Sequence, residues 1–440
     1  MRTNVAAKTL TERTHEGGVA GRQTPLVELR RAVSTCMLWE DTFYEKGSDI
    51  AARIADLCDR VDALHITSLA VVARRDLKLR HVPLFLVLQA LRRNSADKRG
   101  GAGIWRTIAE VVQRPDELAE LLALYWKDGR RPIPAQMKKG LAAAFGKFGP
   151  YALAKWNRDQ AIKLRDVLFL VHAKPKDAEQ DALWKRLVAG ELEAPDTWEV
   201  ALSTGADKRA TWERLIREDK LGYMALLMNL RNMVDAQVDP ALVEKALRDG
   251  AHGSRALPFR FVTAAKHAPR FASALSDAMV SAIEGKLAGE TLVVVDVSGS
   301  MNDTLSAKSQ MTRLEAAGAL AVLVREITPA CRIFTFSDAL MEVPNFRGLA
   351  LVDAIDLSQA HSSTRLGAAL KALKAAVPSI HRIIVITDEQ AHDGLVPSWS
   401  RYGYLINVAP YKPGLDVSGG WTRISGFSER VVEWMTAEES

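Results

Sequence analysis

The sequence has few cysteines, and those it has are widely separated. Its 440 residues contain three, Cys36, Cys58 and Cys331, which are odd in number and follow no metal-ligand spacing. This pattern argues against a disulfide-stapled scaffold and against a cysteine-based zinc site. We expect the thiols to be small apolar side chains in a reducing compartment.

The sequence also lacks a long apolar run. The longest, "VPLFLVLQAL" from Val82, is far too short to span a bilayer. The first residues, "MRTNVAAKTLTERTHEGG", have no apolar region typical of a secretory signal. We therefore expect a cytoplasmic protein. Residues 1–24 are polar and rich in Gly and Thr, so they are predicted to form a flexible N-terminal arm.

Residues 25–288 have helical periodicity. Apolar residues recur at three- and four-residue spacing in segments such as "DIAARIADLCDRV" and "RFASALSDAMVSAI", and Gly, Pro or Asp occupy the breaks. The pattern predicts roughly fourteen to sixteen short helices and no strand. Short amphipathic helices need neighbours on both sides, which favours an irregular HEAT-like α-solenoid. A compact multi-helix bundle remains the alternative.

Residues 289–440 have a different pattern, in which β-branched apolar runs alternate with helical segments. The runs "TLVVVDV", "CRIFTFS", "RIIVITD" and "YGYLINVAP" are predicted strands, and "TRLEAAGALAVLVREI", "TRLGAALKALKAAV" and "FSERVVEWM" are predicted helices. Strands that are apolar throughout are buried on both faces, as in a parallel, doubly wound, Rossmann-like sheet. The chain is thus predicted to combine an α domain with an α/β domain.

Polar residues follow two of these strands. Asp296 ends the first strand, Ser298 and Ser300 follow it in a turn, and Asp388 ends "RIIVITD". The carboxyl ends of parallel strands meet at one edge of the sheet, where ligands bind. Two carboxylates placed together repel each other, and a hard divalent cation with hydroxyl ligands relieves that repulsion. Thr364, in the loop "SSTRLG", can supply another hydroxyl. The alternative is that the serines only cap a helix.

This set of residues resembles the metal-ion-dependent adhesion site of von Willebrand factor A domains. The resemblance implies Mg²⁺ held by Asp296, Ser298, Ser300, Thr364 and Asp388, with a free position for an acidic group of a partner. Two features depart from the family pattern: Ser362 and Ser363 precede the threonine where many members have glycines, and Arg365 follows it.

No nucleophile, general base and oxyanion site occur together, so we expect binding rather than catalysis and no enzyme activity. A metal-dependent nuclease is a weaker alternative, because two-metal cleavage normally needs more carboxylates than this edge offers.

Positive charge is concentrated between Arg130 and Lys176. This segment holds eleven Lys and Arg against two Asp, a formal charge of +9, whereas the whole protein carries +6. Four aromatic residues, Phe145, Phe148, Tyr151 and Trp156, are interleaved. A solvated helical face is one interpretation. The shortage of acidic partners favours phosphate binding instead, with RNA as a natural ligand for a groove lined by cations and aromatic rings.

Longer segments strengthen the RNA interpretation. "LRRAVSTCMLWEDTFYEKG", "KKGLAAAFGKFGPYALAKWNRDQAIKLRDVLFLVHAKPK", "MNLRNM" and "LPFRF" together resemble the TROVE module of the Ro autoantigen family, in which a von Willebrand A domain follows. The resemblance implies a monomeric ring that takes single-stranded 3′ ends of misfolded RNAs in its hole and small non-coding Y RNAs on its basic outer face. It also implies a role in RNA quality control, in a ribonucleoprotein, with an exoribonuclease as a possible partner.

The resemblance assigns RNA contacts to individual residues. Lys155, Arg158, Arg165 and His172 match basic positions of the family that contact Y RNA, although a histidine at a helix end can also serve as a cap. Lys138 and Lys139 are further candidates for the same surface. A protein-interaction adaptor, using the metal site to grip an acidic residue of a partner, is the alternative function.

Overall fold

The structure is a computed structural model of the chain. It describes residues 24–34, 47–77, 79–96, 103–203, 205, 207–254, 256–305, 309–391, 393–409, 415, 419–425, 431, 435–436 and 439. The predicted N-terminal arm, Cys36 and most of the predicted helix "FSERVVEWM" lie outside the described residues.

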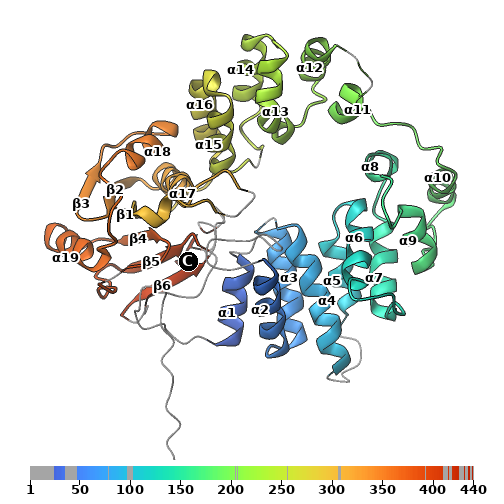
Figure 1. Cartoon of the computed structure of the whole chain (residues 1–440), viewed down its shortest axis with the longest axis horizontal. Helices are drawn as coiled ribbons and strands as arrows, with labels where there is room; N and C mark the ends of the chain where they lie inside the picture. The colour runs from blue at the N-terminus through green and yellow to red at the C-terminus, as the bar shows by residue number, and fades with distance from the viewer. Residues whose placement is uncertain are drawn as a thin grey trace, which may run out of the picture. The chain divides into compact units, whose positions relative to one another are not determined.

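Helices and the loops between them make up the described residues up to 282, as the periodicity predicts (Figure 1). The α-helices in the described part of this region are α1 (Pro25–Ser34), α2 (Gly47–Asp59), α3 (Ala63–Arg75), α4 (His81–Ala96), α5 (Ile104–Val111), α6 (Pro115–Tyr125), α7 (Ala135–Phe145), α8 (Pro150–Trp156), α9 (Leu164–Val171), α10 (Ala178–Ala189), α11 (Trp198–Ser203), α12 (Lys208–Arg217), α13 (Tyr223–Asp235), α14 (Pro240–Asp249), α15 (Pro258–His267) and α16 (Ala272–Ala282). A short 3₁₀ turn, η1 (Pro269–Phe271), lies between the last two.

Local sequence explains where many of these helices begin and end. Pro stands at the start of α6, α8, α14 and α15, where its missing N–H costs nothing. Asp177 accepts a hydrogen bond from the Gln180 backbone N–H and so caps α10. Gly190 ends that helix in the left-handed region, at φ 77°.

The chain divides into two compact units. The helical unit runs from α1 to α12, and the sheet unit runs from α13 to the end of the sheet. Within each unit a helix packs mainly on helices close to it in sequence, such as α3 on α4 and α5 in the first and α15 on α13 and α16 in the second. This is the arrangement of stacked helices, as in an α-solenoid, rather than that of a compact bundle. The predicted domain border at residue 289 coincides with the change from helices to strands, although α13–α16 pack with the sheet.

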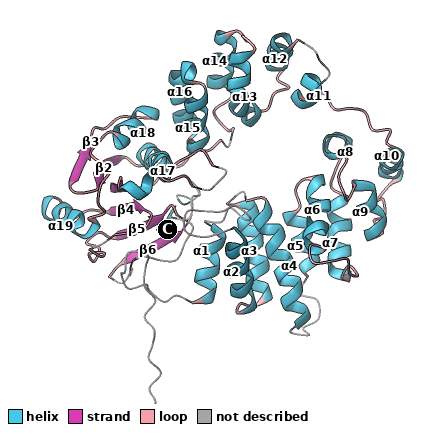
Figure 2. Ribbon diagram, viewed as in Figure 1, coloured by secondary structure: helices cyan, strands magenta, loops and turns pink. Residues whose placement is uncertain are grey.

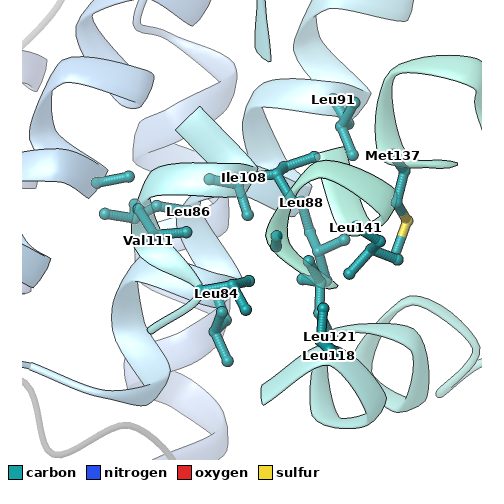
Figure 3. Packing of buried hydrophobic residues seen from close by; sticks show 14 of the residues in the cluster. Leu84, Leu86, Leu88, Leu91, Ile108, Val111, Leu118, Leu121, Met137 and Leu141 are labelled. Carbon is teal, nitrogen blue, oxygen red and sulfur yellow. The ribbon is translucent and has the colours of Figure 1, made fainter. Parts of the chain in front are cut away.

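The helical unit has one continuous apolar core. Figure 3 shows side chains of α4, α5, α6 and α7 meeting in it, among them Leu84, Leu86, Leu88, Leu91, Ile108, Val111, Leu118, Leu121, Met137 and Leu141. A buried ion pair crosses the same region, because the Arg74 guanidinium donates to both carboxylate oxygens of Glu117 at 2.6 and 2.8 Å. Glu117 also accepts from the Gln113 and Arg114 backbone N–H groups, so this buried charge is well hydrogen-bonded.

The sheet unit contains a six-stranded sheet in the order β3-β2-β1-β4-β5-β6 (Figure 2). Every strand pair is parallel except β2 with β3. This confirms the predicted α/β class and a mostly parallel, doubly wound sheet. The strands are β1 (Glu290–Asp296), β2 (Ala330–Phe336), β3 (Leu340–Val343), β4 (Arg382–Thr387), β5 (Tyr402–Asn407) and β6 (Trp421–Ser425).

Helices cover both faces of this sheet. α19 (Leu366–Ala376) packs Leu366, Leu370 and Leu373 against one face, with alternate strand residues such as Leu292 and Val294. α17 (Arg313–Ile327) packs on β1 and β2 and also contacts α15 and α18 (Leu349–Asp356). The strands β3 and β6 and the helix α18 are additions to the elements predicted from sequence.

Gly140 marks the closest approach between α5 and α7. A Cβ there would lie 2.6 Å from Ile108 Cβ and 2.9 Å from the Trp105 carbonyl oxygen. Gly140→Ala is therefore expected to destabilise the protein by about 1–3 kcal/mol, because the two helices must move apart. Denaturant unfolding measures this.

Gly149→Ala is the control, since a Cβ at Gly149 meets nothing within 4 Å. Equal stability of the two variants would contradict the close packing of α5 on α7.

Candidate functional site

Four of the five metal-site residues predicted from sequence lie together in the sheet unit, namely Asp296, Ser298, Ser300 and Asp388. β1 and β4 are neighbours in the sheet and parallel, so Asp296 at the end of β1 and Asp388 just after β4 reach the same edge. Both carboxylates are fully buried, with no exposed surface. A metal site shared by Asp296 and Asp388 requires β1 and β4 to be adjacent, and they are adjacent in the sheet.

The turn after β1 holds Asp296 firmly. Its Oδ1 accepts from the Ser298 backbone N–H at 2.9 Å, and its Oδ2 accepts from the Thr387 hydroxyl at 2.6 Å. The hydroxyl oxygens of Ser298 and Ser300 lie 3.5 Å apart. The next residues form a 3₁₀ turn, η2 (Gly299–Asn302). One carboxylate and two hydroxyls are thus presented together at the sheet edge.

Asp388 has its own donors. Its Oδ2 accepts from Arg313 Nη1 at 3.1 Å, and its Oδ1 accepts from the Gln390 backbone N–H at 3.3 Å. The Ser300 hydroxyl also hydrogen-bonds to the Asp388 carboxyl group. Arg313, the first residue of α17, was not predicted from sequence. Its partner lies 75 positions further along the chain, so no local pattern could reveal the pair.

The loop that carries Thr364 lies against this turn. The Gly299 backbone N–H points to the Ser362 carbonyl oxygen at 3.5 Å, and Thr364 is buried at 5% exposure. The hydroxyls of Ser362 and Ser363, which replace the expected glycines, both donate to the Asp338 carboxylate. These two hydrogen bonds lower the pKa of Asp338, and the exposed Arg365 guanidinium lowers it further, so Asp338 interacts with all three residues that depart from the family pattern.

Electrostatics at this edge favour a bound cation. Burial, with the neighbouring Asp388, raises the pKa of Asp296 to about 7. Burial also raises the pKa of Asp388, against the opposing effects of Ser300 and Arg313. A divalent cation removes the repulsion between two ionised carboxylates. Oxygen donors from carboxylates and hydroxyls fit Mg²⁺, so the residues present fit the expected ion.

The donor set differs from that of a site built from acidic residues or cysteines. Among the residues that the structure describes, no group of three or more His, Cys, Asp or Glu side chains is placed to hold a metal. Any ion at this edge therefore depends on serine and threonine hydroxyls. Ser298, Ser300 and Thr364 are the hydroxyl residues that the sequence pattern assigned to this ion.

The RNA-binding residues predicted from sequence all lie in the helical unit. Lys155 Nζ and the Arg158 guanidinium lie 5.8 and 4.8 Å from the centre of the Trp156 ring. The Arg114 guanidinium, from the start of α6, stacks on the same ring at 3.7 Å. Three cations thus gather on one half-buried indole, and we call this group the Trp156 cluster. Arg114 was missed because it precedes the basic segment.

A second indole has a similar setting. Lys139 Nζ lies 4.1 Å and the Arg106 guanidinium 4.9 Å from the Trp105 ring centre. Lys138 is half-buried on α7, whereas Arg165 on α9 and His172 are exposed. His172 ends α9 in the left-handed region, at φ 53°, so it is a helix cap as well as a surface residue. In the described part of the chain, none of these three residues forms a hydrogen bond, ion pair or ring contact with either indole.

Not every cation of the basic segment is available to a ligand. Lys147 donates to the Ala109 and Val112 carbonyl oxygens at the end of α5, and burial lowers its pKa. Lys163 pairs with Asp159 at 2.6 Å. The exposed positive charge of the segment therefore comes mainly from its other Lys and Arg residues.

The two cysteines in the described part match expectation only in part. Cys58 is buried, and burial raises the pKa of its thiol to about 12. Cys331 is partly exposed, with its pKa raised to about 11. Neither thiol ionises readily near neutral pH. In the same described residues, no helix has the length and apolar character needed to cross a membrane.

Comparisons with known proteins agree with this architecture. The family model for the TROVE domain matches residues 177–316, from the start of α10 into α17. The Ro (RSR) protein of Deinococcus radiodurans matches 94% of this chain and 98% of its own, at 19% identity and a TM-score of 0.58. A TROVE domain is thus recognised over residues 177–316 of this chain. The fold of the chain, helices followed by a mostly parallel sheet consistent with a von Willebrand A domain, is that of the Ro protein.

Two curated relatives share a shorter segment. Telomerase protein component 1 of Mus musculus is 37% identical over 89 residues, and that of Rattus norvegicus is 36% identical over 89 residues. Each match covers 18% of this chain and 3% of the relative, so the chain spans a small part of these proteins' length. The basic segment Arg130–Lys176 precedes the range that the TROVE model matches.

The raised pKa of Asp296 predicts a pH dependence. The folded state keeps a proton up to about pH 7 that the unfolded chain releases near its ordinary value of 3.8. Stability without divalent ions should therefore fall as pH rises from about 4 to 7. At pH 8 in EDTA, Asp296→Asn should be more stable than wild type by at least about 1 kcal/mol, and Mg²⁺ should stabilise only the wild type.

Thermal unfolding with and without Mg²⁺ measures both effects. Asp353→Asn, at an exposed position on α18, is the control. A wild-type stability that is flat from pH 4 to 8 and insensitive to Mg²⁺ would contradict this account of the sheet edge.

Proposed function

We propose that this protein is a non-catalytic RNA-binding protein whose basic helical surface holds the RNA. The observation that carries the proposal is the Trp156 cluster, in which Arg114, Lys155 and Arg158 gather on one ring. The fold shared with a Ro protein supports it, since RNA binding is what the resemblance to that family implies.

The accessible charge of the cluster favours a polyanion as the ligand. Asp116 pairs with Arg114 through both of its oxygens, and the nearest carboxylate oxygen of Glu199 is 4.0 Å from Lys155 Nζ, so these two cations have acidic neighbours. Arg158 is exposed and lies over the Trp156 ring, so its guanidinium is accessible to an anion from outside the chain. A phosphate backbone that neutralises such cations releases its own counterions, which drives binding. A guanidinium held flat on an indole also offers its other face to an unpaired base.

The identity of the RNA is part of the same proposal. We expect a small non-coding RNA like Y RNA on the basic surface, and single-stranded ends of misfolded RNAs in a central hole of a monomeric ring. The proposed biological role is RNA quality control in the cytoplasm, with an exoribonuclease as a possible partner. Sequencing the RNA that co-purifies with the protein tests this assignment. Ribosomal and messenger fragments in proportion to their abundance would contradict it.

Mg²⁺ is the proposed resident ion of the sheet unit. Asp296 and Asp388 would hold it with the hydroxyls of Ser298, Ser300 and Thr364. The ion would neutralise the buried carboxylates and leave a position for an oxygen ligand from outside the chain. Hydrogen bonds from the Ser298 backbone N–H, Thr387 and Arg313 hold the two carboxylates in place.

The convergence of these donors favours a second candidate function. An acidic side chain of a partner protein could complete the coordination of the ion, so the sheet unit would act as an adaptor. Asp296→Asn should then abolish a protein partnership while leaving RNA affinity unchanged. Affinity purification with and without EDTA measures this, and partners retained in both conditions and by the variant would exclude the adaptor.

Removing three cations should weaken RNA binding and its dependence on salt. In the variant Lys155→Ala, Arg158→Ala, Arg165→Ala, each lost phosphate contact reduces the slope of log affinity against log salt by about 0.7–0.9. The expected change is roughly 2–3 in slope for three contacts. Fluorescence anisotropy with a labelled single-stranded RNA and a labelled RNA stem-loop, over a salt series, measures it.

The matched control removes three cations from α12 of the same unit, by Lys208→Ala, Arg209→Ala and Arg217→Ala. Arg209 and Arg217 both pair with Glu213, so their charge is partly compensated within the helix. If the two triple variants lose affinity equally, the binding reflects net charge alone, and the proposed surface is wrong.

A further inference from the structure

Arg313 places a permanent positive charge inside the candidate metal site. Its side chain is 1% exposed, and its Nη1 donates to Asp388 Oδ2 at 3.1 Å and to the Ser300 carbonyl oxygen at 2.9 Å. Both partners belong to residues assigned to the ion. A guanidinium does not lose its proton in a protein, so this charge is present at every ordinary pH.

A second carboxylate lies within reach of the same nitrogen. Asp303 Oδ2 is 3.6 Å from Arg313 Nη1, and the side chain of Asp303 is 35% exposed, whereas that of Asp388 is fully buried. The Arg313 backbone N–H donates to the Asp303 carbonyl oxygen at 2.9 Å. The guanidinium therefore stands between a buried carboxylate of the site and a partly exposed one outside it.

The backbone that carries Arg313 is fixed. Thr312 and Glu315 form a reciprocal capping box at the start of α17, and Lys266 of α15 donates to Glu315 at 2.9 Å. If Arg313 exchanges one carboxylate partner for another, its side chain must therefore move while the start of α17 stays in place.

Another buried arginine in this unit shows a different arrangement. Arg382, at the start of β4, binds the Glu439 carboxylate, the Thr291 hydroxyl and the Ala288 carbonyl oxygen. Among the described residues its acidic partner is Glu439, which is not assigned to a ligand. Arg313 differs because two carboxylates lie within reach, one of them in the candidate site.

We propose that Arg313 is a resident counter-ion of Asp388 that competes with the divalent cation. Without the ion, the guanidinium neutralises Asp388. When the ion binds, the guanidinium gives up Asp388 and pairs with Asp303. This inference rests on the proposed Mg²⁺ site. It makes ion binding weaker than the five donors alone would give, and it moves one positive charge toward the surface whenever the ion is present.

The test is a mutant cycle on the full chain, with MgCl₂ and MnCl₂ binding measured by isothermal titration calorimetry. Arg313→Gln should bind the ions about tenfold more tightly, because no fixed cation competes for Asp388. Asp303→Asn should bind them about threefold to tenfold more weakly, because the displaced guanidinium has lost its new partner. Adding Asp303→Asn to Arg313→Gln should change nothing further.

Thermal unfolding gives an independent readout. In EDTA, Arg313→Gln should lower the Tm, and saturating Mg²⁺ should restore most of the loss. Arg382→Gln is the matched control, and its loss should not respond to Mg²⁺. If Arg313→Gln fails to fold in EDTA, Asp303→Asn alone and Arg313→Lys, which keeps the charge and should bind like wild type, carry the test.

The outcomes separate the possible errors. Wild type that binds the ions while Arg313→Gln binds them equally or more weakly overturns the competition and leaves the metal site standing. If Asp303→Asn weakens ion binding equally in wild type and in Arg313→Gln, Asp303 is a ligand of the ion. That result overturns the exchange of partners. Absence of binding by wild type and by Arg313→Gln overturns the metal site together with this inference.

Discussion

The structure depends on the attraction between opposite charges. The two units compensate their charges in different ways. In the sheet unit, two fully buried carboxylates meet at one sheet edge, where Arg313 compensates one of them. In the helical unit, several cations gather on aromatic rings with few acidic residues beside them. Buried charge requires a partner inside the protein, whereas exposed excess charge attracts one from outside. We therefore propose a small cation as the ligand of the sheet unit and a polyanion as the ligand of the helical unit.

The sequence predicted the fold wherever long apolar patterns specify it. β1, β4 and β5 are almost wholly buried, and β2 is buried over its last four residues. The helices α17 and α19 have clear amphipathic or apolar periodicity. β3 was missed because it is an edge strand of four residues, and most of its side chains are partly or fully exposed. Edge strands make few contacts, so their sequences carry a weak pattern. β6 is short and α18 has eight residues, which leaves little periodicity to detect.

The same contrast holds for the sites. Asp296 and Asp388 were predictable because parallel strands end at a common edge. Their hydrogen-bond partners Thr387 and Arg313, and the aspartate at 338 that anchors the serines before Thr364, come from tertiary contacts between distant segments. Arg114 joins the proposed RNA surface because its guanidinium lies over the Trp156 ring. The two residues are 42 positions apart, and the sequence identified Trp156 only as an aromatic residue in a basic segment. Local sequence thus identifies the ligand side chains, whereas the tertiary fold determines which charged or polar groups pair with them.

The most direct test of the central claim is to map where RNA touches the chain. Full-length protein bound to its co-purified RNA is crosslinked with ultraviolet light and digested, and the crosslinked peptides are identified by mass spectrometry. The account predicts crosslinks concentrated between Arg114 and His172, with Trp156 among the modified residues. Crosslinks confined to the sheet unit, or spread evenly over the chain, would contradict it.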